Sequence, residues 1–244
     1  MTIDSRAPWK DRIIFEDEAC VVINKLSGES SEDIAPPDSA GGKPFFPVHR
    51  LDMPVSGCLL LAKTPEAAAF LGEAFARRSG IVLKNYWAIV EIPENDNALP
   101  NEAELSHWLY EDRKRNKSFA APLPDSDGKE RRPGRNGSRP QKALLRYRLA
   151  GKGEHYLFLE IELVTGRHHQ IRAQLAAIGL HIKGDLKYGA RRSEKNGGIR
   201  LHACSLVFPD LLNRGGRIEA KALPPEMDTL WDAFAKMSKM THCE

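Results

Sequence analysis

Short apolar runs separated by turn residues make up most of this chain, and this pattern limits the folds that it can adopt. In residues 156–164, apolar side chains recur at every second position while Glu160 and Glu162 point the other way, as in a half-buried strand. A second apolar run at 142–149 precedes it, and the turn residues at 151–154 predict that the two strands pair antiparallel. The pattern therefore favours a fold built on a sheet.

Similar patterns predict the remaining elements. Residues 57–63 are apolar almost throughout, so we expect a strand that is buried on both faces. Thr64 and Pro65 are typical of a helix start, and Gly80 is typical of a helix end. The other expected strands are 12–15, 20–25, 83–92, 103–109 and 200–208, and the expected helices are 65–78, 168–178 and 225–240.

Strands outnumber helices, and most of them are joined by short turns. This argues for the α+β class, with a mixed, largely antiparallel central sheet and flanking helices. A doubly wound nucleotide-binding fold is not expected, because no Gly-rich loop leads from a strand into a helix.

Composition describes an ordinary globular protein with one large domain or two small ones. The chain has 244 residues, of which 41% are hydrophobic, and it contains no apolar run of the roughly 18 residues that a membrane span needs. Residues 1–10 lack the apolar core of a secretory signal. The four cysteines show no metal-type spacing and fit a reducing compartment. We expect a cytoplasmic protein with no membrane partner.

Positive charge is concentrated in one segment. Residues 113–142 contain ten Lys or Arg and three acidic residues, a net charge of +7 in a chain whose total is +3. Such a segment is suited to binding phosphates. It could also be a solvated loop that binds nothing. Gly, Pro and Ser within 113–140 also predict a disordered insertion.

Asp52 lies in the run HRLDMPVSG at 49–57, between an Arg-Leu pair and the apolar strand. The run predicts a tight bend at a strand entrance, where a carboxylate can be held at the floor of a cleft. An Asp before a Pro-containing turn can also simply cap that turn.

The run TGRHHQIR at 165–172 follows a strand and begins a helix, an arrangement that favours anions. Arg172 is next to the buried stripe of that helix, so it needs a carboxylate partner. Asp52 is the partner we prefer. Three structural acids are also possible partners, namely Glu160, Glu162 and Asp185.

Other chemistry is less well supported by the pattern. Neighbouring histidines on a helix point about 100° apart, so His168 and His169, with His181 further on, do not predict a metal site. Tyr86 follows Lys84 on a strand and is either a half-buried sheet residue or a residue that stacks on a base. Ser56 lacks the glycine frame of a hydrolase nucleophile.

These motifs resemble those of the RluA-type RNA pseudouridine synthases. The resemblance rests on HRLD at 49–52 with Ser-Gly at 56–57, on TGRHHQIR at 165–172 continued by 178–179 and 184–189, on KNY at 84–86 and on LHA at 201–203, all in the family's order. It covers about residues 13–208. It implies the pseudouridine synthase fold, in which a mixed sheet carries a central cleft.

The resemblance also implies roles for individual residues. Asp52 matches the catalytic aspartate, and Arg172 matches the arginine that pairs with it. Arg50 matches an arginine that occupies the space left by the flipped base, and Tyr86 matches a tyrosine that packs against the target base. Further substrate-binding residues implied by the motifs are Arg167, His169 and Leu201.

The departures from the family pattern remove no motif residue that carries chemistry, and they bear on substrate contacts more than on activity. They are Val55 in place of Thr, His168 in place of Thr or Ser, Gln174 in place of His, and Leu26 in place of Pro.

The implied function is isomerisation of uridine to pseudouridine in structured ribosomal or transfer RNA. The resemblance implies base flipping, no cofactor and no metal, with RNA as the partner, no obligate protein partner and a monomer by default. We expect one catalytic domain over 8–244, interrupted by the basic insertion at 113–140 and without a separate N-terminal RNA-binding domain. Two different functions compete with this one: a non-catalytic RNA-binding or ribosome-assembly module on the same fold, and a metal-dependent hydrolase that uses His168, His169 and Asp52.

Overall fold

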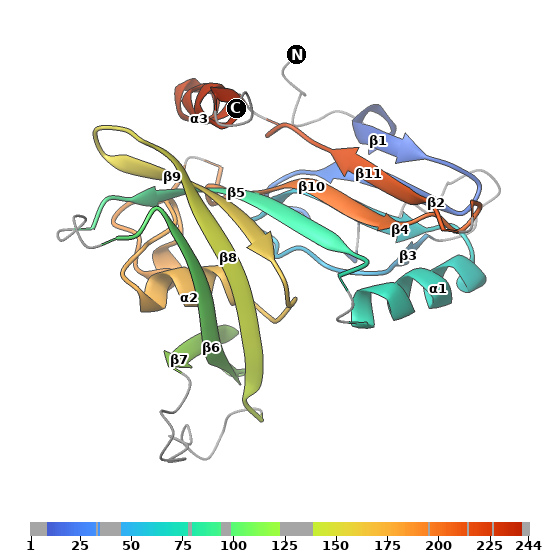
Figure 1. Cartoon of the computed structure of the whole chain (residues 1–244), viewed down its shortest axis with the longest axis horizontal. Helices are drawn as coiled ribbons and strands as arrows, with labels where there is room; N and C mark the ends of the chain where they lie inside the picture. Colours follow the sequence, from blue (N-terminus) through green and yellow to red (C-terminus); the bar gives the residue numbers. More distant parts are fainter. Residues whose placement is uncertain are drawn as a thin grey trace.

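Eleven strands in the described part of the chain form one mixed sheet (Figure 1). Their order is β1-β2-β4-β10-β5-β9-β8-β6-β7, with β3 on β4 and β11 on β10. The computed structural model describes residues 9–32, 34, 45–77, 80–93, 99–122, 139–194, 196–213, 215–225 and 227–240.

The strands are β1 (Ile13–Glu16), β2 (Cys20–Lys25), β3 (Phe46–Pro47), β4 (Ser56–Ala62), β5 (Leu83–Glu91), β6 (Glu102–Asp112), β7 (Lys117–Pro122), β8 (Gln141–Lys152), β9 (Tyr156–Leu163), β10 (Leu201–Pro209) and β11 (Arg217–Lys221). The helices are α1 (Pro65–Ala76), α2 (Gln170–Ala177) and α3 (Thr229–Met240), with short 3-10 turns at Trp9–Arg12 and Leu186–Tyr188.

One parallel strand pair joins the two halves of the sheet. β4 runs parallel to β10, with Gly57 opposite Ala203, whereas the other strand pairs among the described residues are antiparallel. Gly57 has φ +118°, and a Cβ there would lie 2.3 Å from the carbonyl oxygen of Ala203. The close approach therefore requires glycine. It places the loop before β4 next to the start of β10.

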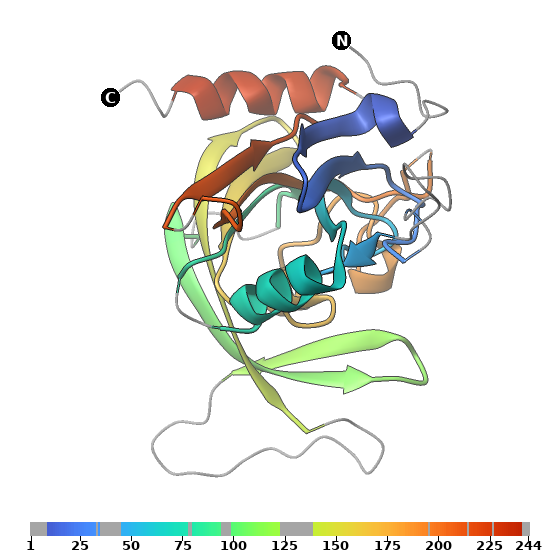
Figure 2. The same ribbon diagram turned by 90° about the vertical axis from the view of Figure 1, so that its right-hand side faces the viewer.

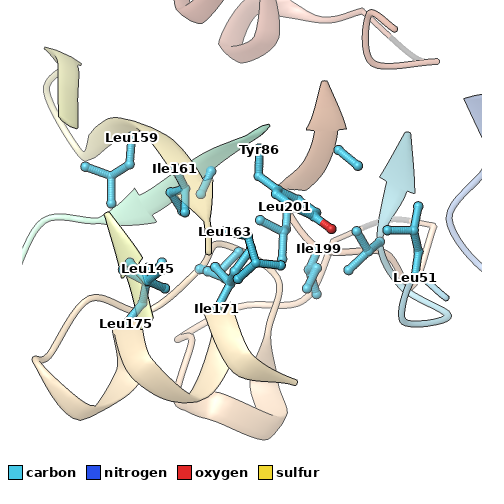
Figure 3. Close-up of a cluster of buried hydrophobic side chains, with 14 of the residues drawn as sticks. Leu51, Tyr86, Leu145, Leu159, Ile161, Leu163, Ile171, Leu175, Ile199 and Leu201 are labelled. Atoms are coloured by element: carbon cyan, nitrogen blue, oxygen red, sulfur yellow. The ribbon is translucent and has the colours of Figure 1, made fainter. Parts of the chain in front are cut away.

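The largest hydrophobic cluster lies on the face of the sheet that α2 covers. Strand alternation puts Tyr86, Ala88 and Val90 of β5 on this face, where Ile171 and Leu175 of α2 pack (Figure 3). On the opposite face of β5, Ile89 belongs to a second cluster. This cluster also contains Phe158 of β9 and Trp231 and Phe234 of α3. The sheet is thus buried on both faces at β5, beside the cleft described below.

Helix α1 begins as the sequence predicts. Thr64 accepts a hydrogen bond from the backbone N–H of Ala67 at 3.2 Å, and Pro65 occupies the first turn. Figure 2 shows α1 in the middle of the molecule, between α3 and the long β6–β7 hairpin. No helix of the described residues is both long and apolar enough to cross a membrane.

The α+β class and the mixed, mostly antiparallel sheet are confirmed. The disorder predicted for 113–140 is wrong for residues 117–122, because they form β7 and pair antiparallel with β6. Residues 123–138 lie outside the described part of the chain. The predicted helix at 168–178 is shorter, because His169 adopts a left-handed conformation with φ 52° and α2 begins after it.

Candidate active site

A pocket of about 560 Å³ opens where the two halves of the sheet meet. Segments far apart in the sequence line it: the loop before β4, the end of α1, the start of β5, the end of β9 with the turn into α2, and the start of β10. The lining includes all the residues that the sequence singled out as functional, namely Arg50, Asp52, Tyr86, Arg167, His169, Arg172 and Leu201.

Asp52 lies in the pocket on a tight turn. The backbone N–H of Val55 donates to the carbonyl oxygen of Asp52 at 3.0 Å, which closes the turn that the sequence predicts. The side chain of Asp52 is 15% exposed and lines the pocket. Ser31 holds the preceding residue, because its hydroxyl donates to the carbonyl of Leu51 and accepts from the N–H of Leu51.

Lys25, which was not predicted as a site residue, binds the backbone of the turn that holds Asp52. Its side chain is fully buried at the end of β2, and its ammonium donates to the carbonyl oxygens of Leu26, Met53 and Val55 at 2.9, 3.1 and 2.8 Å. Burial lowers the pKa of Lys25 to about 8. A lysine that ends a buried strand, after four apolar residues and Asn24, was the available signal.

Arg172 binds two carboxylates. Its Nη1 donates to Oδ2 of Asp52 at 3.0 Å, while its Nε and Nη2 donate to the two oxygens of Asp185 at 2.6 and 2.8 Å. The arginine therefore binds both the preferred partner, Asp52, and one of the structural acids, Asp185. Glu160 and Glu162 are engaged elsewhere, since Glu160 pairs with Arg148 and Glu162 with Arg146.

The three groups form a buried ionic cluster. The side chains of Arg172 and Asp185 are 6% and 1% exposed, and the guanidinium lies 4.9 Å from the ring centre of Tyr188. Two hydrogen bonds to Asp185 fix the plane of the guanidinium, because a carboxylate and a guanidinium match in two-pronged geometry. Arg172 thus presents an N–H of Nη1 to Asp52 in a defined direction.

His169 is the second neighbour of Asp52. Its Nε2 lies 3.6 Å from Oδ2 of Asp52, which is too long for a direct hydrogen bond, and its Nδ1 hydrogen-bonds with the hydroxyl of Tyr188 at 3.0 Å. Burial and the nearby charge of Arg172 lower the pKa of His169 to about 2, so the ring is neutral.

Tyr86 and Leu201 form the apolar wall of the pocket. Both are buried, and Figure 3 shows them close together above Leu163 and Ile171. The pKa of the Tyr86 phenol is raised by burial and then by the charge of Asp52. The hydroxyl of Tyr86 has no hydrogen-bond partner among the described residues. A flat apolar group that enters the pocket would meet this wall beside the carboxylate.

The arginines at the rim differ from Arg172. Arg50 is exposed and has no ion-pair partner in the described part of the chain, while Arg167 is half-buried at the turn into α2. The pocket therefore combines the paired carboxylate of Asp52 with outer cations, an arrangement that suits a neutral ring carried on a negatively charged backbone.

The histidines considered for a metal site have other contacts. The ring of His168 stacks on His169 at 3.8 Å, and its two nitrogens hydrogen-bond with Ser118 and Asn116 at 2.9 and 3.0 Å. Among the residues with described placement, no three His, Cys, Asp or Glu side chains converge on one point. The contacts of His168 tie the β6–β7 hairpin to the pocket.

Known proteins are similar to this chain in sequence and in fold. Residues 18–177 match the family model described as RNA pseudouridylate synthase. An uncharacterized RNA pseudouridine synthase from Zymomonas mobilis is 34% identical over 187 residues, which are 73% of this chain and 70% of the relative. Ribosomal large subunit pseudouridine synthase C from Rickettsia prowazekii is 32% identical over 86% of this chain and 68% of the relative.

Some other curated relatives are longer, and the chain spans 61% of one from Mycoplasma pneumoniae and 55% of one from Bacillus subtilis. The solved structure of human RNA pseudouridylate synthase domain containing 4 superposes with a TM-score of 0.70 over 95% of this chain and 94% of that one. At 24% identity this likeness concerns the fold.

Proposed function

Because this chain belongs to the RNA pseudouridylate synthase family, we propose that it isomerises uridine to pseudouridine in RNA with Asp52 as the catalytic carboxylate. The observation that carries the proposal is the bond of Asp52 to Arg172 at 3.0 Å, in a pocket that also holds Tyr86. An acid in this position faces an RNA polyanion, which is unfavourable for a protein that only binds RNA. A catalytic role accounts for its presence, and this favours the synthase over a non-catalytic RNA-binding or ribosome-assembly module.

Arg172 provides the counter-charge of Asp52 in this proposal. When the substrate covers the pocket and water leaves, the guanidinium, 3.0 Å from Oδ2 of Asp52, remains as the opposite charge beside the carboxylate. Asp185 holds the guanidinium in place, so Asp52 does not have to orient it.

The target base has to leave its stack to reach Asp52, which costs a few kcal/mol. We propose that the base enters against Tyr86 and Leu201, whose apolar surfaces it covers. The exposed Arg50 then fills the space that the base vacates, which offsets part of the unstacking. His169 stays neutral and adds no charge that would compete with Arg172 for Asp52.

The reaction rearranges one nucleoside without a second reactant. The N1–C1′ bond breaks, either by attack of Asp52 at C1′ or by removal of a sugar proton by Asp52, and the uracil turns. A bond then forms between C5 and C1′; in the first route it displaces Asp52 from C1′, and in the second Asp52 returns the proton to the sugar. C5 then loses its proton and N1 gains one. Product and substrate are isomers, so we propose that the reaction requires no cofactor or metal.

RNA would approach over the β6–β7 hairpin. Arg113, Lys114 and Arg115 are exposed at its tip, and Ser118 ties the hairpin to His168 at the pocket. Such cations contact phosphates without reading sequence. We propose ribosomal or transfer RNA as the substrate and residues 8–244 as one catalytic domain. The protein would act as a monomer in the cytoplasm without an obligate protein partner.

The test is chemical mapping of pseudouridine in total RNA from cells with and without this gene. We expect at least one uridine that is modified only when the gene is present, and we expect the purified protein to restore the modification in RNA from the deletion strain. Identical maps from both strains, with no gain on treatment, would contradict the proposal.

A further inference from the structure

Lys84 is a charged residue of the pocket to which the proposed reaction gives no task. It lies at the start of β5, on the same face as Tyr86 and two residues before it, so the two are about 7 Å apart along the strand. Its ammonium lies beside the turn into α2, 3.3 Å from the position that a Cβ on Gly166 would occupy. Lys84 therefore reaches across the pocket toward Arg167.

The protein supplies no anion to Lys84. In the part of the chain that the structure describes, this half-buried lysine has neither a hydrogen bond nor an ion pair, and its charged neighbour Arg167 has the same sign. Burial and this neighbour lower the pKa of Lys84. A partly buried lysine beside a charge of the same sign is unfavourable unless an anion binds the lysine.

The other described lysines that are not exposed all have a partner within the protein. Lys25 donates to three carbonyl oxygens, Lys63 binds Glu16, Lys183 pairs with Glu194, and Lys117 donates to the carbonyl of Lys187. Each of these lysines is satisfied within the fold. Lys84 is the exception in the described residues, and it faces the pocket where RNA is proposed to bind.

Building on the proposed function, we infer that Lys84 and Arg167 together bind a phosphodiester group of the RNA strand next to the target uridine. Lys84 is then a positioning residue: a nucleotide whose base contacts Tyr86 brings one of its phosphates within reach of the ammonium. Gly166 has no side chain beside the ammonium, where a Cβ would lie 3.3 Å from Nζ of Lys84. The contact would hold the sugar of the flipped nucleotide over Asp52.

The experiment compares Lys84→Gln, Lys84→Arg and the matched control Lys236→Gln, an exposed lysine of α3, with the wild type. The probe is a short single-stranded oligouridylate, and its affinity is measured by fluorescence anisotropy between about 0.05 and 0.2 M salt. We expect Lys84→Gln to bind about tenfold more weakly, as for loss of one charge-assisted hydrogen bond. The slope of the logarithm of the binding constant against the logarithm of the salt concentration should become shallower by about 0.7, the value for one phosphate contact on a single strand.

Thermal unfolding of the free protein separates this role from a structural one. Because Lys84 repels Arg167 and has no anionic partner among the described residues, Lys84→Gln should unfold at the same temperature as the wild type or a higher one. Lys84→Arg should retain most of the affinity, and Lys236→Gln should change neither quantity. Unchanged affinity and salt dependence in Lys84→Gln would overturn the inference, as would a lower unfolding temperature that Lys84→Arg fails to restore.

The outcome is also separable from that of the proposed function. If Lys84→Gln weakens RNA binding but the wild type forms no pseudouridine, the phosphate site stands and the proposed function fails. If the wild type forms pseudouridine and Lys84→Gln binds RNA and turns over as the wild type does, the function stands and the phosphate site fails.

Discussion

At the level of single residues, the site depends on one guanidinium shared by two carboxylates. Asp185 takes two N–H groups of Arg172 and is almost fully buried, while Asp52 takes one and faces the pocket. Asp185 therefore holds the guanidinium in place, and Asp52 remains available for chemistry. Asp185 is thus a positioning residue, although it does not line the substrate pocket.

Replacing Asp185 with Asn should therefore be costly to folding. An amide has one acceptor oxygen where the carboxylate has two, and its NH₂ group would face the guanidinium, so the buried ion pair is broken. We expect the free energy of unfolding, measured by urea denaturation, to fall by about 3 kcal/mol or more.

A matched control is Glu104→Gln, which removes one of the two carboxylates that pair with Arg146, in an ion pair whose side chains are 51% and 52% exposed. Its effect should be much smaller than that of Asp185→Asn, because exposed ion pairs contribute little. Equal effects of the two substitutions would contradict the structural role given to Asp185.

The sequence motifs identify the members of this cluster but not their arrangement. They single out Asp52 and Arg172, and Asp185 is one of the acids that could pair with the arginine. Spacing along the chain does not reveal that a guanidinium with five N–H donors bonds both acids at once. Lys25 was missed for a related reason, since its acceptors are backbone carbonyls, which leave no pattern in the side chains.

At the level of strands and helices, the position of Asp52 depends on how β4 meets β10. The turn that holds Asp52 leads directly into β4, and the parallel contact of Gly57 with Ala203 sets where β4 begins. Helix α1 then follows β4 and completes one side of the pocket. A small change at Gly57 should thus disturb both stability and catalysis.

We expect Gly57→Ala to destabilise the protein by at least about 1–2 kcal/mol. An L-residue is strained at positive φ, and the added Cβ would lie 2.3 Å from a backbone oxygen that cannot move away without breaking the strand pair. The measurement is urea denaturation, together with the rate of pseudouridine formation at a temperature where the variant stays folded.

Gly72→Ala is the control. Gly72 lies within α1 at ordinary φ, and a Cβ there would meet nothing within 4 Å. Alanine should stabilise this helix by roughly 0.5–1 kcal/mol. If Gly57→Ala were as stable as Gly72→Ala, the close approach of β4 and β10 would not be a constraint.

The elements were predictable wherever a local pattern was strong. Strand β2 at Cys20–Lys25 matches its prediction, and β4, β5 and β9 are within a residue at each end. Strand β7 was missed because its residues lie in a basic, polar segment, and its pairing with β6 is a tertiary preference that outweighs composition. The start of α2 was misplaced because a left-handed histidine has no local signature.

At the level of the whole molecule, the sheet brings together residues from four distant parts of the chain. Asp52 comes from the loop before β4, Tyr86 from β5, Arg172 from α2 and Leu201 from β10, and all four line one pocket. The strand order places the elements that carry or precede these residues side by side, since β4, β10, β5 and β9 are neighbours in the sheet and α2 follows β9. Local patterns predict strands but not their order, so this convergence was reached from the sequence only through the family resemblance.

The catalytic role of Asp52 can be tested by a single-turnover measurement with Asp52→Asn on RNA that contains the mapped uridine. The substitution keeps the size of the side chain and an acceptor for Arg172, so the variant should fold cooperatively and bind the RNA within a few-fold of the wild type. We predict that it forms no detectable pseudouridine. Pseudouridine formation by Asp52→Asn at a rate comparable with the wild type would show that this carboxylate does not perform the chemistry.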